Sequence, residues 1–380
     1  MIIDLSFIEL WCGHSIIWLV WQILKIVIGI LIAYLIIYFY LKKNKSKKKK
    51  EYFSKIEYDL LAIDIPDSEQ GPKGAEQIFA QLASLKEKDF RQLDISLEII
   101  GIDGHIQFLV RTPHLYRDIV ESALYAQYPQ AGISEVDDYS QIEYLSFPNE
   151  QYTLWGSELT LYANEAYPIR TYPDFEDKLA REFKDPLSGL LELLSTLRTS
   201  EQFWIQILLR PASSNWQAKG KQLVKDLTAP SEEGKAQRLT LGDARVVEAI
   251  QHKISKIGFA VTIRLIYFAK KEIFSKSRII GVLGAFNQFN TLDMNGFKPF
   301  KKSKTRTGLI FPQRCLSRRQ NEILNNYQQR KSKSITPWFV LNIEELATIY
   351  HFPVISVKAP GIKKTVSKQA EPPFGLPVNE

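Results

Sequence analysis

Cysteine is scarce in this chain. Only Cys12 and Cys315 occur among the 380 residues, and about 300 positions separate them. Small disulfide-built proteins carry several closely spaced cysteines, so a disulfide framework is excluded. Scarce cysteine also fits a reducing compartment, where free thiols persist.

Motifs that hold nucleotides, metals or activated nucleophiles are missing as well. A phosphate-binding P-loop needs Gly, four residues and then Gly-Lys-Ser/Thr, but the Gly-Lys pairs at 220–221 and 234–235 are followed by Gln and Ala. The five histidines are scattered, and none stands in an HExxH or paired Cys/His spacing. No GxSxG nucleophile elbow occurs. The sequence therefore predicts a protein that is not an enzyme and has no catalytic residue, cofactor or metal.

Charge is distributed unevenly, although the net charge is only +7. Residues 298–334 carry eleven Lys or Arg and one acid, Glu322, for a net charge of +10, whereas residues 51–297 sum to −9. A basic segment on an acidic body is a candidate binding surface. Seven lysines fall within nine residues near the amino terminus: Lys42, Lys43, Lys45, Lys47, Lys48, Lys49 and Lys50.

An apolar segment, residues 16–41, directly precedes these lysines. About 20 apolar residues suffice to cross a bilayer, and the positive-inside rule keeps the lysines in the cytoplasm. A cleaved signal peptide would carry its positive charges before the apolar stretch instead. The sequence predicts a single-pass protein of the cell membrane, with the body after about residue 50 in the cytoplasm. The seven lysines are predicted to contact anionic lipid at the membrane surface.

The remainder of the chain alternates between strand and helix patterns. Residues 95–99 and 106–110 alternate apolar and polar side chains around the turn signal Gly101-Ile102-Asp103-Gly104, which predicts a hairpin. Residues 106–111 recur in similar form at 205–210, which suggests an internal repeat. We therefore predict an α+β fold with an amino-terminal transmembrane helix followed by two ferredoxin-like α/β sandwich units.

The predicted domain boundaries follow from these patterns. They are an outside tail and single transmembrane helix at 1–41, a basic juxtamembrane segment and linker at 42–72, a first α+β unit at 73–170, a second at 171–297, and a basic connector, short helix and Pro-rich tail at 298–380.

Several segments resemble a known family. They are Leu97–Ile100, Ile106–Arg111, Ala126–Pro129 and Glu344–Pro353. Together they resemble the amino-terminal, non-ATPase region of HerA/TraG-type ATPases of conjugation and type IV secretion systems, in which a Pro-rich end is followed by the ATPase domain. The resemblance implies a membrane-anchored, non-catalytic scaffold or assembly component of a DNA or protein translocation machine. It would work with a P-loop ATPase on a separate chain.

Other functions and partners remain open at this point. The 298–334 segment would suit a membrane-tethered nucleic-acid-binding module, and an uncharacterised membrane enzyme is the third alternative. The expected partners are the lipid bilayer and a P-loop ATPase in trans, with nucleic acid and a second copy of the chain left open. Arg314, Arg318 and Arg319 are the predicted partner-binding residues. A contact with the body itself or with a partner protein ranks above lipid or phosphate, since no aromatic platform for stacking single strands is visible.

Overall fold

A computed structural model describes residues 18–40 (except 19 and 36), 56–64, 70–85, 94–142, 145–177, 182–229, 240–331 and 336–354. The chain divides into two compact units, Met1–Glu57 and Tyr58–Glu380. In the first unit, Val20–Tyr40 forms a helix with a mean hydropathy of 2.4. None of its described side chains is buried. By length and composition it could cross a membrane, as the sequence predicted, whereas Lys42 to Lys50 lie outside the described residues.

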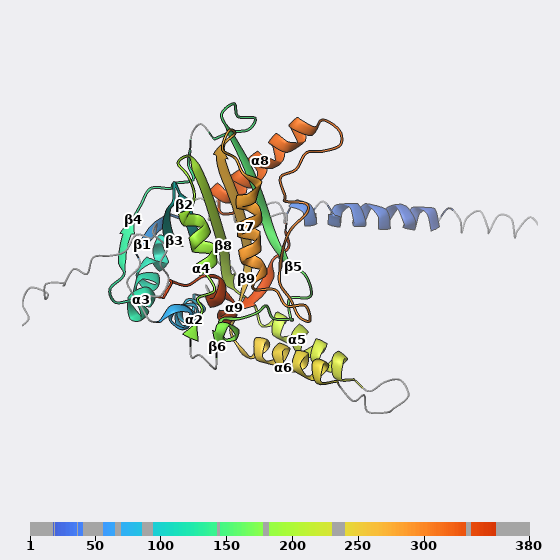
Figure 1. Ribbon diagram of the computed structural model, residues 1–380. Helices are drawn as coiled ribbons and strands as arrows, with labels where there is room; N and C mark the ends of the chain where they lie inside the picture. Colours follow the sequence, from blue (N-terminus) through green and yellow to red (C-terminus); the bar gives the residue numbers. More distant parts are fainter. Residues whose placement is uncertain are drawn as a thin grey trace, which may run out of the picture. The chain divides into compact units, whose positions relative to one another are not determined.

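The second unit is built on one antiparallel sheet of nine strands (Figure 1). The strands are β1 (Tyr58–Asp64), β2 (Ile95–Ile102), β3 (His105–Pro113), β4 (Gly132–Glu135), β5 (Tyr152–Leu161), β8 (Glu201–Pro211), β9 (Gly258–Lys270), β10 (Phe297–Pro299) and β11 (Phe339–Asn342). They lie in the order β10-β5-β9-β8-β2-β3-β1-β4, and β11 pairs with the start of β9. The short strands β6 (Glu176–Asp177) and β7 (Glu182–Phe183) pair separately. The predicted α+β class is confirmed, and the sheet of the second unit is antiparallel.

The predicted hairpin is formed by β2 and β3. Asp103 and Gly104 occupy its turn with φ angles of 53° and 82°, a left-handed pair that matches the twist of the flanking strands. Asp tolerates this region better than most residues, and Gly adopts it freely. The turn chemistry therefore acts locally and sets the register in which Ile102 faces His105.

The sheet consists of two halves with the same strand order. In the first, β1 lies between β4 and β3, and β2 follows β3; in the second, β5 lies between β10 and β9, and β8 follows β9. The halves join where β2 pairs with β8, from Ile95 opposite Leu209 to Ile102 opposite Gln202. The matching segments 106–111 and 205–210 lie on β3 and β8, so the sequence match relates strands at non-equivalent places. The predicted boundary at residue 170 assigns β5 to the first unit, whereas β5 pairs with β9 and β10.

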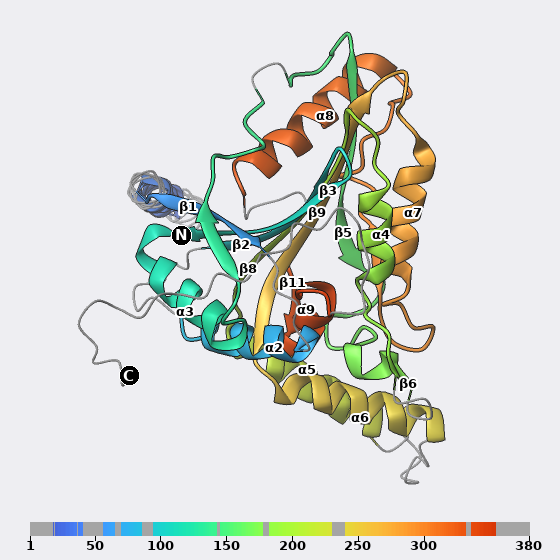
Figure 2. The same cartoon turned by 60° about the vertical axis from the view of Figure 1, so that its left-hand side comes forward.

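Helices cover both faces of the sheet. The helices packed into the main core on one face are α2 (Gly71–Leu82), α3 (Arg117–Gln127), α4 (Ser188–Ser195), α7 (Lys276–Asn287) and α9 (Ile343–Ile349). On the other face, α8 (Pro312–Gln328) packs over a second core that contains Trp204, Ile266 and Tyr327. Figure 2 shows α8 on one side of the strands and α4 and α7 on the other. This coverage explains why β9 is apolar almost throughout rather than alternating.

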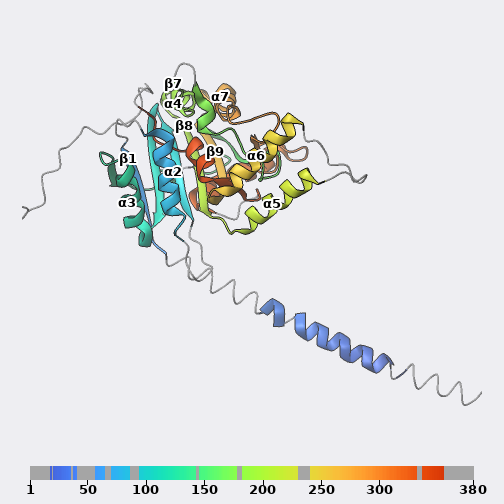
Figure 3. The same ribbon diagram turned by 90° about the horizontal axis from the view of Figure 1, so that it is seen from below.

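Two further helices, α5 (Asn215–Thr228) and α6 (Leu241–Ser255), connect β8 to β9. They lie side by side, away from the main layers (Figure 3). Trp216, Ile250, Ile254 and Val340 form a small separate core beneath them. The pair is therefore an insertion into the second half of the sheet, with its own apolar contacts.

A glycine in β5 lets α8 approach the sheet closely. A Cβ at Gly156 would lie 3.0 Å from a methyl group of Ile323, tighter than an ordinary contact. Next to this contact, the Gln320 side-chain amide donates to the Leu154 carbonyl at 2.9 Å. The helix is therefore held against β5 by direct packing and by a buried hydrogen bond.

Candidate functional site

Beneath the carboxyl end of α8 lies a buried polar network centred on Glu98 of β2. Glu98 has no exposed surface, and Arg330 donates to its two carboxylate oxygens at 3.0 and 3.1 Å. Ser96, Tyr139 and Gln206 donate to the same carboxylate at 2.6 to 3.1 Å. Burial alone would raise the pKa of Glu98, but the charge of Arg330 and these hydrogen bonds outweigh it and hold the pKa below its ordinary value.

Arg330 reaches this carboxylate from an unusual backbone position. It follows α8 with a φ of 44°, at the place where a helix terminus most often has Gly. The Arg330 amide donates to the Tyr327 carbonyl and the Lys331 amide to the Asn326 carbonyl, both at 3.0 Å, which is the Schellman pattern of helix termination. The Arg330 side chain also pairs with Asp138. Arg330, one of the last basic residues of the 298–334 segment, is therefore paired with carboxylates inside the body.

A second buried pair fixes the same end of α8. Arg264 of β9 donates from Nε to Glu158 of β5 at 2.9 Å, and neither side chain has exposed surface. The Arg264 guanidinium also donates to the Gln206 side chain and to the Asn326 carbonyl of α8, at 2.9 and 3.0 Å. The charged groups of both pairs, Glu98–Arg330 and Glu158–Arg264, have hydrogen-bond partners within the protein. The two pairs therefore have a structural role, which is to hold the end of α8 against the sheet.

These buried charges were not predicted from the sequence. A signal was present, because Glu98 interrupts the apolar run of β2 and Arg264 interrupts that of β9. A charge inside a strand that is covered on both faces must find a partner. Their partners could not be read from the sequence, since Arg330 follows Glu98 by 232 positions.

The predicted partner-binding arginines lie on the amino-terminal half of α8. Arg314 and Arg318 are exposed, and Arg319 is half-buried. Arg319 donates to the carbonyl of the exposed Arg306 at 3.4 Å, which brings Arg306 to the same helix. We call Arg306, Arg314, Arg318 and Arg319 the α8 basic surface. Within the described ranges none of the four forms an ion pair with a carboxylate.

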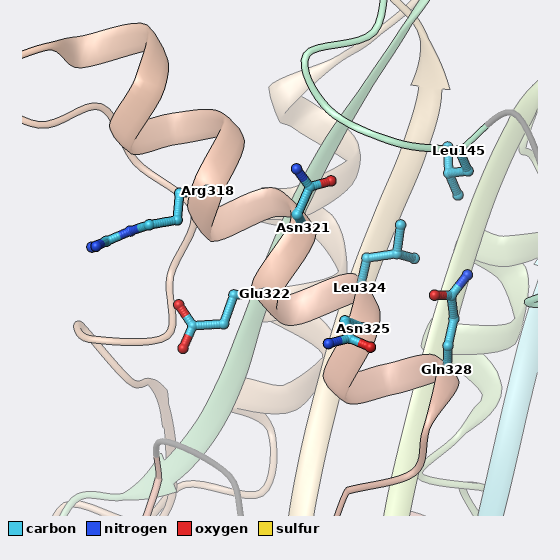
Figure 4. Close-up of a pocket in the computed structure, with 7 residues that line it drawn as sticks. All are labelled: Leu145, Arg318, Asn321, Glu322, Leu324, Asn325 and Gln328. Atoms are coloured by element: carbon cyan, nitrogen blue, oxygen red, sulfur yellow. The ribbon is translucent and has the colours of Figure 1, made fainter.

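A shallow groove of about 710 Å³ runs along α8. Its lining residues are Leu145, Arg318, Asn321, Glu322, Leu324, Asn325 and Gln328. In Figure 4, Arg318 and Glu322 extend from one side of the helix, while Gln328 approaches Leu145 across the groove. The groove therefore offers amide donors and acceptors beside the α8 basic surface, and the structure places these three predicted arginines together without showing what they bind.

Redox enzymes are among the solved structures that show a detectable likeness to this chain. Glucooligosaccharide oxidase from Acremonium strictum, an FAD protein, is 12% identical, with a TM-score of 0.30 over 80% of this chain and 56% of its own. Xylooligosaccharide oxidase from Myceliophthora thermophila is 9% identical, with a TM-score of 0.29 over 78% of this chain and 55% of its own. A berberine bridge enzyme variant, a reticuline dehydrogenase, is 10% identical, with a TM-score of 0.23 over 62% and 42% of the two chains.

These matches correct two predictions. All three are enzymes, which contradicts the prediction that the protein is not an enzyme. The prediction of a non-catalytic scaffold, with a nucleic-acid-binding module as its alternative, is contradicted by the same matches and is not carried further. This chain spans about half the length of the two oligosaccharide oxidases. At these TM-scores, neither a flavin site nor a substrate is assigned to this chain.

Sequence comparison places the chain in a family. No curated protein matches it. The resemblance to HerA/TraG-type ATPases and the expected ATPase partner are not addressed by any of these matches and stay predictions. The model of one protein family, described as "Domain of unknown function (DUF8128)", matches residues 40–365. That range covers all the described strands and helices of the second unit, and the chain therefore belongs to the DUF8128 family.

Proposed function

We propose that this protein is a single-pass membrane protein whose cytoplasmic body binds an anionic partner through the α8 basic surface. The observation that carries the proposal is the absence of any carboxylate partner for these four arginines in the described parts of the chain. Arg330, by contrast, is satisfied by Glu98 and Asp138. Four cations that lack a carboxylate partner and lie on or next to the first half of one helix create a local positive potential that attracts negative charge.

The topology in this proposal rests on charge. The helix Val20–Tyr40 is long enough to span a bilayer, and residues 42–50 supply seven lysines directly after it. Lysines that flank a span are retained on the cytoplasmic side. The folded body, which begins at Tyr58, would therefore meet cytoplasmic partners and the inner surface of the membrane.

We also propose a finer description of the fold. Each half of the sheet has the order fourth, first, third, second strand, in all-antiparallel arrangement. This is the order of a ferredoxin-like βαββαβ unit. Two such units fused edge to edge through β2 and β8 would account for the sheet, with α5 and α6 inserted into the second. The fusion leaves α8 as an addition to the face that the other helices do not cover.

Site-specific crosslinking in native membranes tests the binding surface. A photoreactive amino acid replaces Asn325, an exposed residue of the groove. We expect an adduct with lipid or protein whose yield falls about tenfold or more in the variant Arg314→Ser/Arg318→Ser/Arg319→Ser, because each exposed charge contact is worth up to about 1 kcal/mol. High salt should lower the yield of the unsubstituted chain for the same reason.

A matched control removes the same number of exposed cations elsewhere. The variant Lys219→Ser/Lys221→Ser/Lys225→Ser on α5 should leave the yield unchanged. Absence of any adduct, or an adduct equally strong in both triple variants and at high salt, would overturn the proposal.

A further inference from the structure

An apolar turn precedes α8 directly. Leu309, Ile310 and Phe311, which we call the apolar tip, are 103%, 77% and 67% exposed. Elsewhere in the described part of the second unit, no two large exposed apolar residues are adjacent in sequence. Single exposed apolar side chains are ordinary, but a contiguous group marks an interaction site. The apolar tip is therefore a candidate interaction site.

The backbone of the tip is held in an unfavourable conformation. Phe311 has φ 51° and ψ 60°, a left-handed geometry that is rare for a bulky aromatic residue. Pro312 begins the helix, and the Cys315 amide donates to the Phe311 carbonyl at 3.0 Å. Strain of this kind persists where the surrounding structure enforces it, and it gathers at functional positions. Its effect here is to turn the chain sharply and leave the three side chains outside the fold.

Cations lie directly behind the tip. The Arg314 guanidinium stands 5.6 Å from the centre of the Phe311 ring, and Gly308 packs against Cys315 on the first turn of α8. Arg306 precedes the tip, and Arg318 follows one turn after Arg314. The tip is thus a protruding apolar apex backed by the α8 basic surface, rather than an apolar groove lined by neutral residues.

We infer that the partner of this surface is an anionic phospholipid bilayer, with the apolar tip inserted among the headgroups and acyl chain ends. An apex of large apolar side chains above a layer of Arg matches the composition of an interfacial membrane contact. The apolar side chains enter the acyl boundary, while the guanidinium groups stay with anionic headgroups. A bound peptide would need a concave apolar site, which this convex turn does not provide. The inference rests on the proposed function, because it names the partner of the same surface.

The body is covalently joined to the proposed membrane helix, so even a weak contact between the tip and the bilayer would form readily. The 17 residues between Tyr40 and Tyr58 span at most about 60 Å when fully extended. A tether of this length gives a body anchored by Val20–Tyr40 a high effective concentration at the bilayer surface. Three apolar side chains and four cations would then suffice without a large interface.

The test places a reporter in the tip of the full chain. Ile310→Cys is introduced together with Cys12→Ser and Cys315→Ser, labelled with an environment-sensitive fluorophore, and reconstituted into vesicles. In phosphatidylcholine mixed with phosphatidylserine we expect blue-shifted emission and quenching by lipids brominated on their acyl chains. Both signals should be absent in phosphatidylcholine alone. Because each cation near an anionic surface contributes about fivefold to partitioning, the triple variant of Arg314, Arg318 and Arg319 should lower the equilibrium constant for insertion about a hundredfold.

A second label provides the control. Leu292 lies on another loop, is even more exposed than Ile310, and is followed by Asp293, so a label at Leu292→Cys should respond to neither lipid. An Ile310 label that ignores phosphatidylserine overturns the lipid inference. If the crosslink at Asn325 still depends on the arginines in that case, the proposed function stands and its partner is an acidic protein. If the crosslink fails as well, both are wrong.

Discussion

Removing the Arg330 side chain should destabilise the body severely. In Arg330→Ala, Glu98 keeps its buried position but loses the cation that pairs with it, and Asp138 loses the same ion-pair partner. Breaking a buried ion pair on one side costs about 3–5 kcal/mol. The three neutral donors that remain around Glu98 offset only part of this. We expect the midpoint of thermal unfolding to fall on the order of 10 °C.

A second substitution at position 330 separates the contribution of the ion pair to stability from the contribution of the backbone conformation. Arg330 has a positive φ, which Gly adopts without strain and Ala does not. Arg330→Gly should therefore be less destabilised than Arg330→Ala by about 1 kcal/mol, while both lose the same ion pair. Adding Glu98→Gln to Arg330→Ala should recover part of the loss, because the buried carboxylate is then neutral.

The loss of stability in Arg330→Ala should also depend on pH in a defined direction. In the unsubstituted chain the folded pKa of Glu98 lies below its ordinary value, so its stabilising contribution is present above the unfolded pKa and is lost as the pH falls through the folded pKa. Without Arg330, burial dominates and the folded pKa rises, so the variant should be least impaired in acid.

The assay is unfolding of the full chain in mild detergent, followed by tryptophan fluorescence. Trp204 is buried beside this network, with ring centres of Tyr139 and Tyr327 at 5.3 and 5.4 Å, and should report its opening. If Arg330→Ala unfolds within about 1 kcal/mol of the unsubstituted chain at neutral pH, the reasoning that Arg330 holds α8 to the sheet is refuted.

Three further outcomes are expected. A reporter fused directly after β1 should be active only if it requires the cytoplasm, and activity of an external reporter there would reverse the topology. Gly156→Ala should lower the unfolding free energy by about 1–3 kcal/mol through overpacking, whereas Gly189→Ala, with nothing within 4 Å of the added Cβ, should be neutral or stabilising by calorimetry. Asp185 accepts hydrogen bonds from His351 and the Leu187 amide. Burial alone would raise the pKa of Asp185, but the electrostatic interaction with His351 outweighs burial and keeps this pKa low. Asp185→Asn should therefore destabilise at neutral pH and progressively less as the pH falls through that pKa, and equal loss at every pH would contradict this assignment.

Local features of the fold were predictable from the sequence, and long-range ones were not. The hairpin of β2 and β3 followed from alternation and turn residues, which act within about twenty positions. The apolar helix at 20–40 was equally clear, since length and hydropathy decide it. By contrast, the pairing of β5 with β9 and of β2 with β8 joins distant segments, and apolar strand sequences match one another too easily to identify partners. The resemblance of 106–111 to 205–210 is a case of such a match between non-equivalent strands.

The basic segment shows the same division. Its composition indicated a binding surface, and the structure adds that Arg314, Arg318 and Arg319 lie on one helix, α8. Composition could not separate Arg330, which is paired inside the body, from the arginines that remain exposed. That difference depends on where the chain turns after α8, and the turn is set by a carboxylate on a strand in the other half of the sheet.

The junction between β2 and β8 has a consequence for the order of folding during synthesis. About 100 residues separate the end of β2 from the start of β8, so at 5–20 residues per second the ribosome needs roughly 5–20 s to deliver the partner strand. During that interval β2 is the open edge of a half-built sheet, and an apolar, unpaired edge invites pairing with other chains. The nascent first half must therefore be shielded until the second arrives, and slowed translation between these strands should increase aggregation of the newly made protein.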